Sequence, residues 1–167
     1  MDYSFNGLPV HVLIVHAVVI VLPVAAIVVL LATVWPRARR WFGLVTPILG
    51  VIAAALVYVA KEAGEWLKDR LPDSPLIQEH AELGDTLLPW AIALAVLSVV
   101  VYGWYRVVDT REEDEAPSPL VRRIVAIMLA VAAVVVVPAG IITTVIIGES
   151  GSRAVWEGSF SDTPLEK

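Results

Sequence analysis

The chain contains no cysteine among its 167 residues. Disulfides, thiolate metal sites, cysteine nucleophiles and cysteine-ligated iron–sulfur centres are therefore excluded. Basic residues are also scarce, with 12 Lys and Arg against 17 Asp and Glu, which gives a formal net charge of −5. This balance argues against nucleic acid as a partner. Histidine is also scarce, because only His11, His16 and His80 occur.

What the chain has in excess is apolar sequence. Hydrophobic residues make up 58% of it, and the mean hydropathy is +0.78. They fall into four long runs, and a hydrocarbon core of about 30 Å needs roughly 20 apolar residues to be crossed by a helix. Backbone groups have no water partners there, so helices are the expected structure. We predict an all-α integral membrane four-helix bundle over residues 1–157, with helices at about 8–34, 41–67, 75–106 and 120–147, and a short polar tail at 158–167.

Orientation follows from the arginines and lysines, which favour cytoplasmic loops. If the N-terminus lies outside, the inner loops carry seven of the twelve basic residues, and the tight first loop alone holds Arg37, Arg39 and Arg40. The first run lacks a basic region before it and a small-residue cleavage site after it, which is typical of a membrane anchor rather than a signal peptide. We therefore predict a multi-pass protein of the bacterial plasma membrane, in contact with the lipid bilayer, with both termini outside.

With this topology the three histidines gather at the outer end of the bundle. His16 lies within apolar sequence, where a histidine is costly and by default marks a function. It follows His11 by five residues, which is about 7.5 Å along the helix axis and a rotation of about 140°. The two side chains therefore do not share one helix face. His80 lies at the start of the third helix, on a stripe with Gly84, which would leave room for a bulky group.

Carboxylates are expected at the same level. The second helix brings Glu62 and Glu65, and the fourth brings Glu149. Less specific interpretations stay open for each group. His11 could be an ordinary interfacial histidine, His80 could be solvated, and both glutamates of the second helix could pair with nearby lysines. We predict His11, His16 and His80 as cofactor-binding residues, with Glu62, Glu65 and Glu149 as additional candidate metal ligands.

Three segments resemble a bacterial membrane family known as domain of unknown function 2231, of the actinobacterial type. They are GLPVHVLIVHA at residues 7–17, EHAELGD at 79–85 and GESGSRAVW at 148–156. The resemblance covers roughly residues 7–157. It implies a four-helix membrane protein that associates with redox proteins, since some members are fused to Rieske-type or cytochrome-like modules. Members usually carry a histidine where this chain has Glu149, so the resemblance does not imply a four-histidine arrangement here.

These observations leave three functions open. The first is a haem b or electron-transfer subunit, with His16 and His80 as the axial pair and His11 as the substitute. The second is an outer-face site for a zinc, copper or iron ion. The third is a non-catalytic accessory subunit of a larger respiratory or redox membrane complex. No nucleophile motif occurs, so we expect a binding or electron-transfer subunit rather than a stand-alone catalyst.

Overall fold

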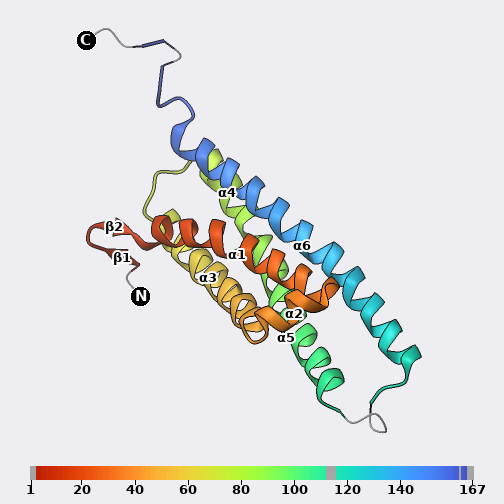
Figure 1. Cartoon of the computed structure of the whole chain (residues 1–167). Helices are drawn as coiled ribbons and strands as arrows, with labels where there is room; N and C mark the ends of the chain where they lie inside the picture. The colour runs from red at the N-terminus through yellow and green to blue at the C-terminus, as the bar shows by residue number, and fades with distance from the viewer. Residues whose placement is uncertain (1–2, 112–115, 162, 165–167) are drawn as a thin grey trace.

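A computed structural model describes residues 3–111, 116–161 and 163–164 of the chain. Six helices and one short hairpin occur in these residues (Figure 1). The elements in chain order are β1 Ser4–Phe5, β2 Leu8–Pro9, α1 Val10–Val34, α2 Pro36–Phe42, α3 Val45–Lys68, α4 Pro75–Asp85, α5 Leu87–Thr110 and α6 Pro119–Trp156.

Four segments of the described residues are long and apolar enough to cross a membrane: α1, α3, α4 together with α5, and α6. The all-α four-helix architecture expected from the sequence is therefore confirmed, and the chain is a multi-pass membrane protein. α1 packs against α3 and α6, α5 packs against α3 and α6, and α4 lies on α6. The first turns of α1, all of α4 and the last turns of α6 lie at the same end of the bundle (Figure 1).

Small residues set how closely the helices approach. The buried core contains many alanines, among them Ala25, Ala53, Ala91 and Ala133. At Gly50 on α3, an added Cβ would lie 2.2 Å from the Oγ atom of Ser98 on α5. Glycine therefore permits this close contact between two helices. Leucine, isoleucine and valine side chains cover much of the outer surface, which suits contact with lipid.

Proline marks the helix boundaries that the sequence predicted best. Trp35, before Pro36, is extended with φ −122° and ψ 108°, and α1 ends at the residue before it. This is the conformation that a following proline favours. Ser74 is likewise extended before Pro75, and α4 begins there as expected. Asn6 and Gly7 both have positive φ, 50° and 77°, which suits the tight turn between β1 and β2.

Several features of the predicted helices were wrong, and one is that the third helix ends at Thr110 rather than at 106. The first inner loop is itself the helix α2, and α3 begins at Val45 rather than 41, because Gly43 turns the chain with φ 46°. The third helix is broken at Thr86, where Pro89 removes a backbone donor from the next turn. The fourth helix continues to Trp156 instead of ending at 147. The predicted tail at 158–167 contains no helix in its described residues, and positions 162 and 165–167 lie outside them.

Candidate functional site at the histidine end

His11 lies in the first turn of α1 and faces α3. Its Nδ1 atom lies 2.8 Å from the backbone carbonyl oxygen of Ala60. A carbonyl oxygen only accepts hydrogen bonds, so Nδ1 carries a proton and donates it, and in the neutral tautomer of the ring the lone pair is on Nε2. One turn along α3, an added Cβ at Gly64 would lie 3.0 Å from the imidazole ring. Glycine at this position therefore allows the α3 backbone to pack directly against His11.

His80 on α4 makes the matching arrangement with α6. Its Nδ1 atom lies 3.0 Å from the Oγ atom of Ser150, which is only 3% exposed. The Ser150 hydroxyl also lies 2.9 Å from the carbonyl oxygen of Ile147, to which it donates its hydrogen. Its oxygen therefore accepts from Nδ1 of His80, and here too the lone pair is on Nε2. An added Cβ at Gly151 would lie 2.9 Å from the His80 ring.

The two imidazole rings lie next to each other. Their centres are 6.2 Å apart and their planes are inclined by 77°. His11 is bonded to α3 and His80 to α6, so this histidine pair links four helices at one end of the bundle. Each ring has a fixed Nδ1–H donor and a neighbouring glycine. The Nε2 atoms of the two rings are then the nitrogens that can bind a metal or a proton.

Ion pairs connect α4, the helix that carries His80, to α3 and α6. Lys61 on α3 pairs with Glu65 on its own helix and lies 3.3 Å from Asp85 on α4. Arg153 on α6 lies 3.9 Å from Glu79 on α4. The carboxylates are about half exposed, and such surface pairs stabilise a protein by at most about 1 kcal/mol each. They contribute more to the position of α4 than to the stability of the bundle.

His16 does not join the pair, so the predicted pairing of His16 with His80 was wrong. The His16 side chain is exposed on the outer surface of α1, and its Nδ1 atom lies 2.6 Å from the carbonyl oxygen of Val12 in the same helix. The rotation of about 140° between His11 and His16 explains the difference, because one faces the bundle when the other faces outward. His11, which we predicted as the alternative to His16, is the histidine of α1 that lies beside His80.

The candidate carboxylates do not gather around the histidines. Glu149 is exposed, Glu65 pairs with Lys61, and Glu62 is half-buried. Within residues 3–111, 116–161 and 163–164, no three His, Asp or Glu side chains come together as a metal-binding group. Of the six candidate ligands, the two that lie next to each other are the imidazoles of His11 and His80. Any further ligand to a metal at this place would come from solvent, a cofactor or a partner.

Sequence reasoning missed the residues that support the pair, namely Gly64, Ser150 and Gly151. It assigned the space-making role to Gly84, but an added Cβ at Gly84 would meet nothing within 4 Å. A signal was present, because Ala60 and Gly64 are small residues one turn apart and Ser150 stands beside a glycine. Small residues at this spacing are typical of close helix contacts.

No family model, curated protein or solved structure matches this chain. The resemblance to domain of unknown function 2231 therefore stays a prediction, and the argument for function depends on the geometry at the histidine end.

Proposed function

We propose that this protein is a membrane metal-binding subunit, in which the Nε2 atoms of His11 and His80 hold one transition-metal centre. The observation that supports the proposal is the state of the two rings. The centres of the two rings are 6.2 Å apart. The Nδ1–H of His11 is bonded to an acceptor on α3, and that of His80 to an acceptor on α6. Metal-binding histidines almost always donate their second nitrogen to such an acceptor, which fixes the tautomer and the ring orientation.

The centres of the His11 and His80 rings are 6.2 Å apart. A metal–nitrogen bond is about 2.0–2.1 Å, so a metal lies roughly 3.2 Å from the centre of a ligating imidazole, and two rings that share one metal have centres at most about 6.4 Å apart. The observed separation is within this limit. Two imidazole ligands would leave the other coordination positions of such a metal open. Imidazole suits copper, zinc and iron, and copper(II) binds most tightly among the divalent ions of this series.

The same pair of ligands could hold a bare ion or the iron of haem b, which takes axial imidazoles. An added Cβ at Gly64 or Gly151 would lie 3.0 or 2.9 Å from the nearest atom of the His11 or His80 ring. Glycine backbone packs against both rings. A single ion therefore fits with less movement of the helices than a porphyrin, and we favour the ion.

A second function has its own support. Both imidazoles already bond across helices, so the pair would also serve as a polar cross-link in a non-catalytic accessory subunit. In that case no metal is needed. We propose this role within a larger membrane complex as the alternative, and metal analysis separates the two.

The experiment uses the full chain, purified in detergent after expression with copper, zinc, iron or a haem precursor in the medium. We expect one metal per chain by elemental analysis, retained in His16→Gln and lost in His11→Gln and His80→Gln. His16 is the matched control, because it lies on the same helix as His11 but faces outward. Helical content by circular dichroism verifies that each variant is folded.

The visible spectrum distinguishes the two forms of the metal. A Soret band with sharp bands after dithionite reduction would assign the site to haem, and stoichiometric metal without such bands would assign it to a bare ion. Metal that is equally present in all three histidine variants would contradict the proposed ligands. If the purified protein contains neither metal nor haem after every supplementation, the metal-binding proposal fails and the accessory-subunit proposal is supported.

The membrane side and the family are proposals as well. We propose that the histidine end faces the outside of a bacterial plasma membrane, since the opposite end carries the Arg37-Ala38-Arg39-Arg40 sequence. We also propose, from the segments at 7–17 and 79–85, that the chain belongs with domain of unknown function 2231 and works beside a redox complex.

A further inference from the structure

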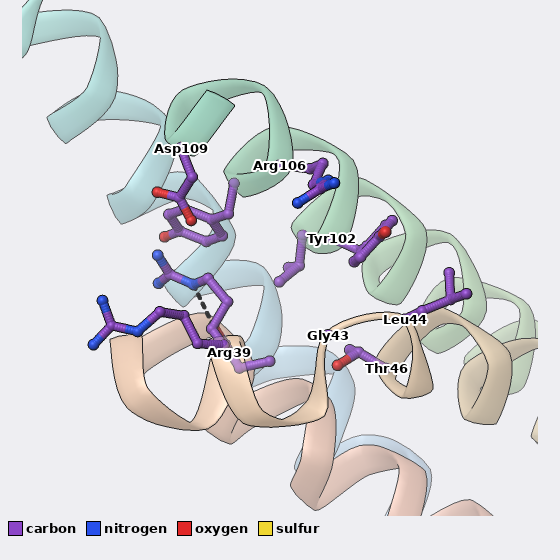
Figure 2. A pocket seen from close by; sticks show the side chains of 11 residues that line it. Arg39, Gly43, Leu44, Thr46, Tyr102, Arg106 and Asp109 are labelled. Atoms are coloured by element: carbon purple, nitrogen blue, oxygen red, sulfur yellow. Dashed lines mark hydrogen bonds between the residues drawn. The ribbon is translucent and has the colours of Figure 1, made fainter. Parts of the chain in front are cut away.

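A cavity of about 340 Å³ lies at the end of the bundle opposite the histidine pair. It is open to the surface and lies where α2, the start of α3 and the end of α5 meet (Figure 2). Three arginines line it, together with two tyrosines and one carboxylate: Arg39, Arg40, Arg106, Tyr102, Tyr105 and Asp109. Neither the proposed metal centre nor the predicted histidine chemistry accounts for this cluster of guanidinium groups.

Arg39 is held rigidly in the wall of the cavity. Its Nε atom donates to the carbonyl oxygen of Ala32 at 2.9 Å, and an Nη atom donates to that of Thr33 at 3.1 Å. The guanidinium carbon lies 3.0 Å from the centre of the Tyr105 ring, a close cation–π contact. Burial lowers the pKa of Arg39, whereas Tyr105 and Asp109 oppose that shift, and an arginine stays charged in proteins. Besides these two backbone bonds, the Arg39 guanidinium also has a hydrogen bond with Tyr105, so Arg39 is mainly a fixed positive charge in the wall of the cavity.

Arg40 and Arg106 bring two further guanidinium groups to the lining of the cavity. Both are exposed and line the same cavity from α2 and α5. Within the described part of the chain neither forms an ion pair, and Asp109 is the one carboxylate among the residues that line the cavity. Three arginines against one carboxylate give this set of lining residues an excess of positive charge. Guanidinium groups bind phosphate oxygens in a bidentate manner, with more directional hydrogen bonds than lysine provides.

The mouth of the cavity continues onto the lipid-facing surface. Leu44 lines the cavity and is 57% exposed, and Val45 and Ile48 follow it as exposed residues on α3. Trp41 is 83% exposed at the same end of the bundle, at a level where aromatic residues typically meet lipid headgroups. An occupant of this site would therefore meet positive charge at its head and an aliphatic surface below it.

We propose that this cavity binds the phosphate group of an anionic phospholipid, with the acyl chains lying along the exposed aliphatic face of α3. Basic pockets between membrane helices at the cytoplasmic side are suited to such headgroups. The anionic headgroup leaves the positive charge of the cavity balanced, whereas a zwitterionic headgroup adds a cation of its own. The site is independent of the metal centre, because it lies at the other end of the bundle.

The test measures binding of short-chain phosphatidylglycerol, phosphatidylcholine and inorganic phosphate to the full chain in detergent by native mass spectrometry. We expect phosphatidylglycerol to bind at least about tenfold more tightly than phosphatidylcholine. The double substitution Arg40→Gln with Arg106→Gln should weaken binding of phosphatidylglycerol by about tenfold or more, since hydrogen bonds to charged groups contribute about 1.5–3 kcal/mol. Both side chains are exposed, so the fold should persist.

The matched control replaces two exposed arginines at the same end that do not line the cavity, Arg37→Gln with Arg123→Gln. It removes the same charge and should retain the binding of phosphatidylglycerol within about twofold. Equal loss in the two double variants would overturn the proposal, because general surface attraction would then explain the binding. Inorganic phosphate that binds as tightly as phosphatidylglycerol would overturn the lipid assignment.

Discussion

His80 and Ser150 are 70 positions apart in the chain, yet the imidazole Nδ1 atom lies 3.0 Å from the serine hydroxyl oxygen. This contact joins the short helix α4 to the last turns of α6. It also sets the proton on Nδ1, because the serine hydrogen is already directed to the carbonyl oxygen of Ile147. Ser150 therefore decides which nitrogen of His80 is available for a ligand.

Replacing Ser150 with alanine tests that role directly. The variant leaves the Nδ1–H of a half-buried imidazole without its acceptor, which we expect to destabilise the protein by about 1–3 kcal/mol. If the proposed metal centre is present, its affinity should also fall about 10- to 100-fold, as for other partners behind a metal-binding histidine. Thermal unfolding in detergent and a metal competition titration measure the two effects. Ser152→Ala, an exposed position on the same helix, should change neither.

The glycines at the histidine end should respond to alanine with opposite signs. At Gly151 the new Cβ would lie 2.9 Å from the His80 ring, so we expect Gly151→Ala to destabilise by about 1–3 kcal/mol. At Gly84 the new Cβ would meet nothing within 4 Å, so alanine should stabilise the helix by up to about 1 kcal/mol. Melting temperatures of the two variants, measured in one detergent, compare them. Destabilisation by both would mean that Gly84 also contacts something.

Arg39 should depend on the shape of its guanidinium group and not on charge alone. Arg39→Lys keeps the charge but cannot donate to the carbonyl oxygens of Ala32 and Thr33 from a planar fork. We expect a loss of about 1–3 kcal/mol, because two charge-assisted hydrogen bonds are weakened. Arg40→Lys, next to it but exposed, should be close to neutral. Chemical unfolding curves would contradict this prediction if the two variants were equally stable.

The membrane orientation has a separate test. Reporter fusions placed after Arg40 should report the cytoplasm, and fusions after Asp73 should report the outside, because arginines near helix ends favour the inner side. The expected result would put the histidine pair outside and the arginine cavity inside. The reverse pattern would exchange the two faces, while the contacts within the bundle would stay as they are.

The helical segments were largely predictable because their causes are local. A run long enough to cross a bilayer must form a helix, and the starts predicted at 75 and about 120 agree with Pro75 and Pro119 as the first residues of α4 and α6. The polar continuation of α6 to Trp156 was not predictable in this way. It is helical where α4 packs on it, through the contacts of His80 with Ser150 and Glu79 with Arg153. The sequence 148–156 carries no apolar stripe that would have indicated this packing.

The sequence by itself determined that four helices are long and apolar enough to cross a membrane, that no metal site here can use a cysteine thiolate, and that His11 and His16 face different directions. Only the tertiary structure decided that His11 faces inward. α1 is apolar on every side, so its periodicity does not mark an inner face. The rotation of the helix is set by contacts with α3 and α4, where Gly64 admits the His11 ring and His80 lies beside it. Such contacts between distant segments depend on packing, which no local pattern contains.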